Sequence, residues 1–99
     1  MAEWKIHEHP DFFKDLDALT KHELEIFAKK KRKIKENPER QKHLSGGANC
    51  YREPLTENIR LIYFIEGNRI WLLTVGKHKE AYMEYLKRLH SLKFRFSNP

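Results

Sequence analysis

Arg60 is the residue of this sequence that most strongly suggests chemistry, because it interrupts the most apolar segment of the chain. Ile59, Leu61 and Ile62 flank it, and an arginine in such surroundings either has a partner or points into a cleft. One interpretation is a structural ion pair with Glu53, Glu57 or Glu66. The other is an anion clamp, since a guanidinium grips a phosphate through paired hydrogen bonds.

Further anion-binding and proton-transferring groups flank the same segment. Arg52 lies on the preceding predicted strand, and His78 stands between Lys77 and Lys79 after the next one. Tyr82 lies one helical turn beyond His78 and projects the same way. This collection suits cleavage of an RNA phosphodiester, which needs proton transfer, cations for the charge on phosphorus and a flat surface for a base.

A second basic feature is the run 29–35, in which six of seven residues are lysine or arginine. It is either the solvated face of an amphipathic helix or a surface that binds phosphates. Solvated faces usually mix charges for i,i+4 pairing, so the excess of one sign favours phosphate binding. The predicted substrate-binding residues are Lys29, Lys30, Arg32, Lys33, Lys77 and Lys79.

Several other kinds of site find little support. The sequence contains no P-loop, no glycine-rich dinucleotide loop and no nucleophile elbow. His22 opens a metalloprotease-like pattern that lacks the second histidine. His7 and His9 could share a strand face, but without a third ligand two exposed histidines are the favoured interpretation. The lone Cys50 excludes a disulfide framework and indicates a reducing compartment.

Hydrophobic periodicity predicts the elements that must position these groups. They are a strand at 4–6, helices at about 10–19 and 20–37, strands at 50–55, 58–66 and 69–75, and a helix at about 79–91. Thr20 and Glu23 have the capping-box pattern, and the short connection there predicts an antiparallel helix hairpin. Residues 39–48 are predicted to form a loop, Gly67-Asn68 a hairpin turn, and residues 93–99 a loose tail.

The predicted fold class is α+β, with the order β-α-α-β-β-β-α and a helical hairpin on one face of a small, largely antiparallel sheet. The first helix is expected to bury Phe12, Phe13, Leu16 and Leu19. The second is expected to bury Leu24, Phe27, Ala28 and Ile34. The other face of the sheet has less to cover it, so part of it could hold a ligand.

Length and charge bound the function. The chain has 99 residues and a net charge of +6, so we expect one domain over residues 1–99 and a polyanionic partner. The most apolar stretch, 59–75, is broken by charged and polar residues, which excludes a membrane span. No signal-peptide pattern opens the sequence. We expect a cytoplasmic protein without a membrane partner.

At these residues the sequence resembles the RelE/ParE superfamily of toxins from type II toxin–antitoxin modules, on the RelE and YoeB side. The most specific likenesses are the family's leucine-x-glycine, tyrosine–basic, arginine-leucine-valine-tyrosine and valine-glycine-basic signatures. They correspond here to Leu44-x-Gly46, Tyr51-Arg52, Arg60-Leu61-Ile62-Tyr63 and Val75-Gly76-Lys77. The likeness covers nearly the whole chain in element order and length.

The resemblance implies a ribosome-dependent endoribonuclease that cuts messenger RNA in the A site, uses no metal or cofactor, and is blocked by a cognate acidic antitoxin. It implies that the 2′-OH of the message attacks the adjacent phosphate. Arg60 would hold that phosphate, Arg52 would help activate the 2′-OH or stabilise charge, His78 would act as acid or base, and Tyr82 would orient the substrate.

The sequence departs from the family at two points. Pro54 replaces a second active-site lysine of RelE, and Ser45-Gly46 stand near the position of the glutamate base of YoeB. Glu53 is only a loose candidate for that base. The alternative function is that of a ParE-like toxin, which binds DNA gyrase and inhibits it without nuclease activity. The clustered Arg60, His78 and Tyr82 favour the nuclease.

Overall fold

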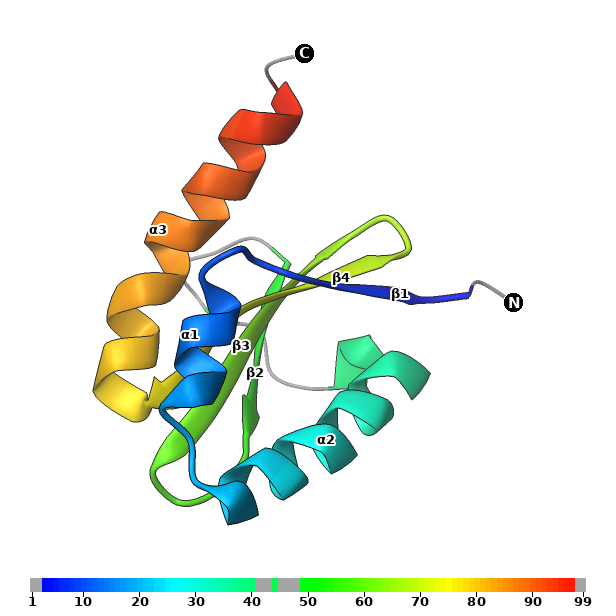
Figure 1. The fold of residues 1–99 in the computed structure, drawn as a ribbon. Helices are drawn as coiled ribbons and strands as arrows, with labels where there is room; N and C mark the ends of the chain where they lie inside the picture. The colour runs from blue at the N-terminus through cyan, green and yellow to red at the C-terminus, as the bar shows by residue number, and fades with distance from the viewer. Residues whose placement is uncertain (1–2, 41–43, 45–48, 98–99) are drawn as a thin grey trace.

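The computed structural model describes residues 3–40, 44 and 49–97. Its elements are β1 (Lys5–Glu8), α1 (Phe12–Asp17), α2 (Lys21–Glu36), a 3-10 turn η1 (Pro38–Arg40), β2 (Cys50–Pro54), β3 (Ile59–Glu66), β4 (Arg69–Lys77) and α3 (His78–Ser97). This order confirms the predicted β-α-α-β-β-β-α arrangement (Figure 1). Most of the predicted loop 39–48, and the end of the predicted tail, lie outside the described residues.

The four strands form one sheet in the order β1-β4-β3-β2. β1 pairs with β4 in parallel, whereas β2–β3 and β3–β4 are antiparallel. The β3–β4 turn is the predicted one, and Gly67 adopts a φ of 59° there, which glycine tolerates at little cost. Arg60 lies in register between Pro54 of the edge strand β2 and Gly76 of β4, so these three residues form one row across the end of the sheet.

Helices cover both faces of the sheet (Figure 1). On one face, α1 and α2 bury Phe12, Phe27 and Ile34 against strand residues such as Leu61 and Leu72. On the other face, α3 packs through Ala81, Tyr85, Leu89 and Leu92 on Cys50, Ile62, Phe64 and Leu73. The expectation that this second face would be thinly covered is therefore wrong along most of the length of α3.

The capping box at the start of α2 is present as predicted. The Thr20 hydroxyl accepts from the Glu23 N–H at 3.1 Å, and the Glu23 carboxylate accepts from the Thr20 N–H at 2.9 Å. Beyond this connection the two helices diverge over the sheet face (Figure 1).

The predicted buried faces of the first two helices are only partly correct. Phe13 is 59% exposed, because it follows the buried Phe12 and successive helical residues are turned by about 100°. In α2 the buried side is centred on Phe27 and Ile34, which leaves Leu24 and Ala28 exposed.

The last helix is longer than predicted. α3 begins at His78 and continues to Ser97, so residues 93–97 are helical and do not form a loose tail. The buried stripe of Tyr85, Leu89 and Leu92 packs α3 on the sheet face and accounts for the helix as far as Leu92.

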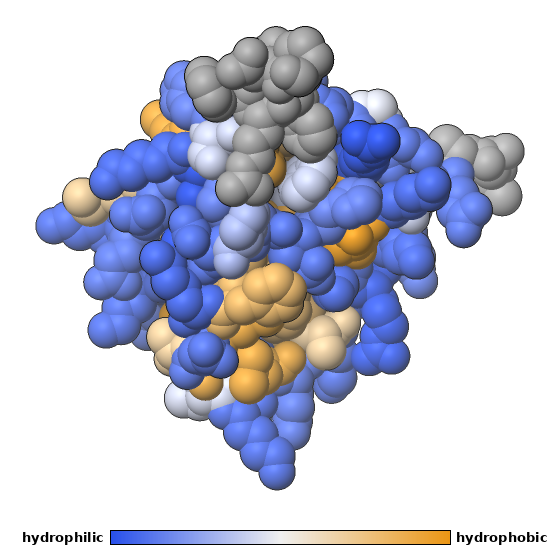
Figure 2. All heavy atoms as spheres, turned by 45° about the horizontal axis from the view of Figure 1, so that its top comes forward, coloured by the Kyte–Doolittle hydropathy of each residue, from blue (hydrophilic) through white to orange (hydrophobic). Residues whose placement is uncertain are grey.

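The surface is mostly polar. Figure 2 shows hydrophilic side chains over most of one face, with an apolar patch near its middle. The large exposed hydrophobic residues of the described chain are Phe13, Leu24, Met83 and Leu86. No helix in the described part is long and apolar enough to cross a membrane.

Candidate active site

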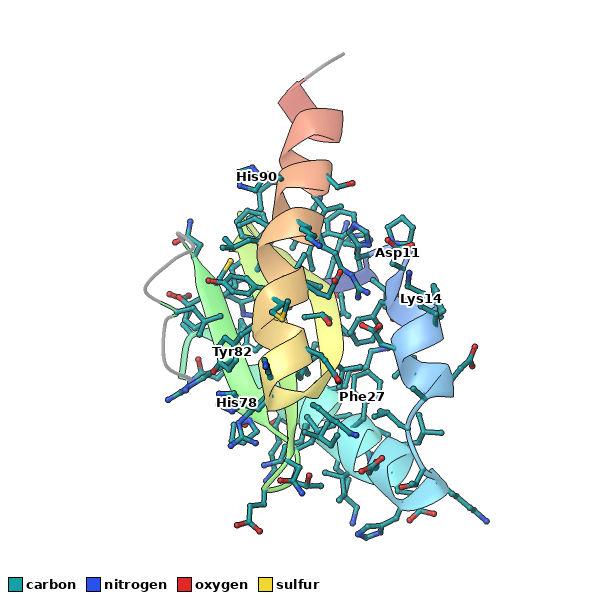
Figure 3. All side chains as sticks on the ribbon, turned by 90° about the vertical axis from the view of Figure 1, so that its left-hand side faces the viewer. Asp11, Lys14, Phe27, His78, Tyr82 and His90 are labelled. Atoms are coloured by element: carbon teal, nitrogen blue, oxygen red, sulfur yellow. The ribbon has the colours of Figure 1, made fainter. Side chains whose placement is uncertain are left out.

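Three of the predicted catalytic residues meet where β2 passes the first turn of α3. The Arg52 guanidinium donates to the Tyr82 hydroxyl through Nη1 at 2.9 Å, although the two residues are 30 positions apart. The His78 and Tyr82 rings lie with their centroids 4.5 Å apart, tilted by 47°. Figure 3 shows His78 and Tyr82 on the same side of the helix, facing the sheet edge. Arg52, Tyr82 and His78 are called the triad cluster below.

The local fold explains why His78 occupies this place. β4 ends at Lys77 and α3 begins at the next residue, without an intervening loop. The His78 N–H donates to the Asn58 carbonyl at 3.0 Å, which ties the start of the helix to the residue before β3. His78 and Tyr82 are then one helical turn apart on a common side. His78, Lys77 and Lys79 are all exposed.

Arg60 lies on the same sheet face as Arg52, since Arg52 is paired with Ile62, two residues along β3. Its side chain is half-buried and folds onto the β2–β3 turn. Nη1 donates to the carbonyls of Thr56 at 2.7 Å, Glu57 at 3.1 Å and Ile59 at 3.2 Å. The ion pair considered for Arg60 is not found among the described residues, because its acceptors are main-chain oxygens.

Glu53 is not placed to serve as a base at this site. It alternates with Arg52 along β2 and faces the α2 side of the sheet, where it is 1% exposed. Its carboxylate lies 4.0 Å from the Lys30 ammonium. The loose suggestion that Glu53 could be the base is therefore wrong on geometry. Ser45 and Gly46 lie outside the described residues.

The basic run is on the opposite side of the sheet from the triad cluster. Lys29, Arg32 and Lys33 are exposed along α2 and line a shallow surface groove. Lys30 is half-buried beside Glu53, and Lys31 pairs with Glu8 at 3.1 Å. The run therefore combines a free outer surface with inner lysines that hold α2 to the strands.

A cavity of about 420 Å³ lies next to the triad cluster but is not part of it. It opens between α1 and α3 along the edge of β4, beyond the end of β1, and its polar rim includes Glu23, Glu80 and Glu84. Gly76 and Lys77 also line it, whereas Arg52, His78 and Tyr82 do not. We therefore place the candidate chemistry at the triad cluster and not in this cavity.

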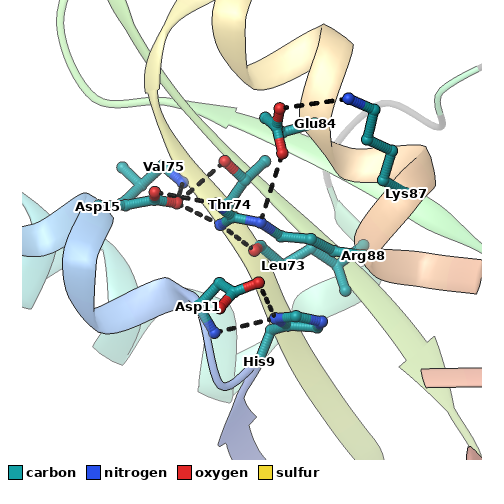
Figure 4. Close-up of polar contacts among 9 residues, drawn as sticks. All are labelled: His9, Asp11, Asp15, Leu73, Thr74, Val75, Glu84, Lys87 and Arg88. Carbon is teal, nitrogen blue, oxygen red and sulfur yellow. Dashed lines mark hydrogen bonds and ion pairs between the residues drawn. The ribbon is translucent and has the colours of Figure 1, made fainter. Parts of the chain in front are cut away.

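An ion pair that the sequence patterns do not predict fixes α3 to the rest of the fold. Asp15 of α1 accepts from both terminal guanidinium nitrogens of Arg88 in α3, Nη1 and Nη2, at 3.1 Å for Nη2 (Figure 4). The same carboxylate accepts from the Thr74 hydroxyl at 3.0 Å and the Val75 N–H at 3.1 Å. β1 pairs with β4 only as far as Leu72, so Asp15 satisfies an edge N–H that has no strand beside it.

This ion pair has a sequence signal, although a weak one. Arg88 is 5% exposed and lies next to Leu89 in the buried stripe of α3. An arginine on an apolar helical stripe indicates a buried partner. The identity of that partner is not visible locally, because Asp15 lies 73 positions earlier.

Tyr85 packs against Tyr82 of the triad cluster. Its ring contacts that of Tyr82 edge-on, with centroids 6.4 Å apart. Burial raises the pKa of Tyr85 above its usual value, and the neighbouring Cys50 and Tyr82 raise it further. Tyr85 therefore stays neutral and acts as a packing surface for Tyr82.

No protein-family model matches the sequence, and no curated protein sequence matches it. Solved structures do match. A double arginine-to-alanine mutant of the toxin RelE from E. coli, in the free state, superposes with a TM-score of 0.74 and 27% identity, covering 89% of this chain and 98% of that one. The same mutant in complex with a peptide of the antitoxin RelB gives 0.67 and 27%, covering 85% and 94%.

An archaeal RelE in complex with RelB, from Pyrococcus horikoshii OT3, shares the fold at a TM-score of 0.64 and 22% identity, covering 80% of this chain and 99% of that chain. The neighbours thus come from bacteria and archaea and are covered almost completely. The family resemblance identified in the sequence is confirmed: this chain has the RelE fold, and the RelE structures at 27% identity support a RelE-like toxin of a toxin–antitoxin module.

Proposed function

We propose that this protein is the toxin of a type II toxin–antitoxin system and a ribosome-dependent, metal-independent endoribonuclease that cuts messenger RNA in the A site. The observation that carries the proposal is the meeting of Arg52, Tyr82 and His78 beside Arg60 in a chain with the RelE fold. Cations, an aromatic ring and a titratable group are the parts that RNA cleavage by an internal nucleophile requires.

In the proposed reaction the 2′-oxygen of the message forms a bond to the adjacent phosphorus, and the bond from phosphorus to the 5′-oxygen breaks. The 2′-OH proton is released to solvent. Arg52 stabilises the negative charge that develops on the 2′-oxygen as this proton leaves. His78 donates a proton to the departing 5′-oxygen. The products are a 2′,3′-cyclic phosphate and a 5′-hydroxyl end.

The contacts of Arg60 are compatible with a phosphate clamp. Nη1 is held by the turn carbonyls of Thr56, Glu57 and Ile59. Nε and Nη2 form the other edge of the guanidinium and make no hydrogen bond within the described residues. That edge presents the paired donors that grip a phosphate, so the same arginine would hold the turn and the substrate.

Tyr82 links the two ends of the triad cluster. Its hydroxyl accepts from Arg52, and its ring lies against His78. A base stacked on this ring would bring its own phosphate close to both residues, since stacking is how single-stranded RNA is commonly held. We therefore assign Tyr82 to orienting the substrate.

The remaining partners follow from charge. Lys29, Arg32 and Lys33 present a basic surface on α2 that would bind ribosomal RNA phosphates, with Lys30 partly engaged by Glu53. Lys77 and Lys79 would bind the message beside His78. An acidic antitoxin would neutralise this basic protein, as complexes of RelE with RelB suggest. With the ribosome as its target, the toxin would act in the cytoplasm.

Cleavage assays on programmed ribosomes test the proposal. The purified protein should cut a message in the A site of a ribosome and leave the same free message intact. His78→Gln should lower the single-turnover rate by about a hundredfold at pH 7, because glutamine forms a hydrogen bond but delivers no proton. His90→Gln is the matched control, since His90 is exposed on the same helix away from the triad cluster (Figure 3).

Two results would contradict the proposal. The first is a wild-type protein that leaves ribosome-bound message uncut. The second is equal activity of His78→Gln and His90→Gln, which would make His78 an ordinary surface histidine.

A further inference from the structure

Gly76 is a glycine that the fold does not need. A Cβ built at this position would have no heavy atom within 4 Å, and its φ is not in the left-handed region. Glycine within a strand nevertheless weakens it, because it loses more freedom on folding and contributes no side chain. A fold-based reason for glycine is present at Gly67, whose φ is +59°, and absent at Gly76.

Gly76 leaves an open space on the sheet face between Arg60 and His78. Gly76 is the register partner of Arg60, so the two residues project from the same face of the sheet. Arg60 folds towards the carbonyls of Thr56 and Glu57 and does not fill the space over Gly76. His78 follows two residues later at the start of α3. Bare backbone therefore lies between the proposed clamp and the proposed acid.

We propose that Gly76 is the floor over which the sugar–phosphate backbone of the message passes, and that a side chain there would hold the scissile phosphate away from Arg60 and His78. This inference rests on the proposed function. Close approach of a ligand to the backbone is one of the reasons for glycine in a strand. Misplacing reacting groups by about 1 Å costs about a hundredfold in rate.

The proposal predicts opposite effects on stability and activity. Gly76→Ala should melt at the wild-type temperature or a few degrees above it, since the methyl group meets open space and the unfolded chain loses freedom. Ribosome binding should be unchanged, because α2 lies on the other side of the sheet. The single-turnover cleavage rate with saturating toxin should fall by about tenfold or more, and Gly76→Val should fall further.

Gly67→Ala is the matched control. It adds the same methyl group at the other end of β4, in the β3–β4 turn. Its positive φ should lower the melting temperature by about 4–8 °C, and its cleavage rate below that temperature should equal that of the wild type. Gly76→Ala should therefore lose activity and keep its stability, whereas Gly67→Ala should lose stability and keep its activity.

The outcomes distinguish this inference from the function on which it rests. If the wild type cuts ribosome-bound message and Gly76→Ala cuts it equally fast, the role proposed for Gly76 is wrong and the proposed function stands. If Gly76→Ala loses activity only in proportion to a fall in melting temperature, Gly76 is structural and the inference is also wrong. If the wild type does not cut, the proposed function fails and this inference fails with it.

Discussion

Replacing Arg88 by methionine should destabilise the protein strongly, although Arg88 is far from the proposed chemistry. The Arg88 side chain is 6% exposed and its partner Asp15 is 14% exposed. Methionine keeps much of the apolar volume of arginine and removes its charge. The Asp15 carboxylate would then be buried with only two neutral donors, the Thr74 hydroxyl and the Val75 N–H.

The expected loss follows from this burial. Removing one partner of a buried ion pair leaves an uncompensated charge and costs about 3–5 kcal/mol. The free energy of unfolding of a domain is only about 5–15 kcal/mol, so the loss is a large share of it. Asp15→Asn in the Arg88→Met background removes the stranded charge and keeps an oxygen for the Val75 N–H. The double variant should therefore be more stable than Arg88→Met alone.

Urea unfolding of the wild type, the two single variants and the double variant measures this coupling. Lys87→Ala is the control, because Lys87 is the neighbour of Arg88 and pairs with Glu84 at 3.8 Å while remaining 74% exposed. Its cost should stay within about 0.5 kcal/mol. An Arg88→Met loss no larger than that of Lys87→Ala, or a double variant less stable than Arg88→Met, would refute the reasoning.

Three further predictions concern single features. Arg60→Ala should lower the cleavage rate by about a hundredfold. It should also lower the free energy of unfolding by about 1 kcal/mol, because Arg60 holds the β2–β3 turn. Unchanged cleavage would leave Arg60 a purely structural role. Replacing Lys29, Arg32 and Lys33 by glutamate should weaken ribosome binding and flatten its salt dependence, while the cleavage rate at saturation stays constant. A fall in that rate at unchanged binding would contradict the assignment of ribosome binding to α2 and of cleavage to the triad cluster. Since the pKa of Tyr85 is raised in the folded state, the wild type should lose stability as the pH rises above about 10, and Tyr85→Phe should reduce that loss in alkaline unfolding curves; parallel curves would show that Tyr85 is not the cause.

Local signals in the sequence were enough for most of the fold. The capping box of Thr20 and Glu23 marks the start of α2 because its hydrogen bonds join residues three apart. Gly67 marks the β3–β4 turn because its conformation is a property of that residue alone. Both predictions depend on short-range chemistry and are correct.

Features that depend on how the helices pack could not be obtained in this way. Phe13 and Leu16 both fit a helical stripe, and only the docking of α1 decides that Phe13 is exposed. The acceptors of Arg60 are backbone carbonyls, which no residue type in the sequence reveals.

The candidate site shows the same division. His78 and Tyr82 are one helical turn apart, so their contact is predictable from spacing. The hydrogen bond from Arg52 to Tyr82 requires α3 to return over the sheet face as far as β2. Asp15 and Arg88 contribute to that placement of α3, and their pairing across 73 positions has no local signature.

The most direct test of the central claim is a comparison of two messages on programmed ribosomes, one unmodified and one with a single 2′-deoxynucleotide immediately 5′ of the phosphate that is cut. The mechanism proposed for Arg52, Arg60 and His78 predicts cleavage of the first, with 2′,3′-cyclic phosphate and 5′-hydroxyl ends, and none of the second at that position. Equal cleavage of the two messages would contradict attack by the 2′-OH. Inhibition of gyrase supercoiling by a protein that leaves both messages intact would contradict the nuclease altogether.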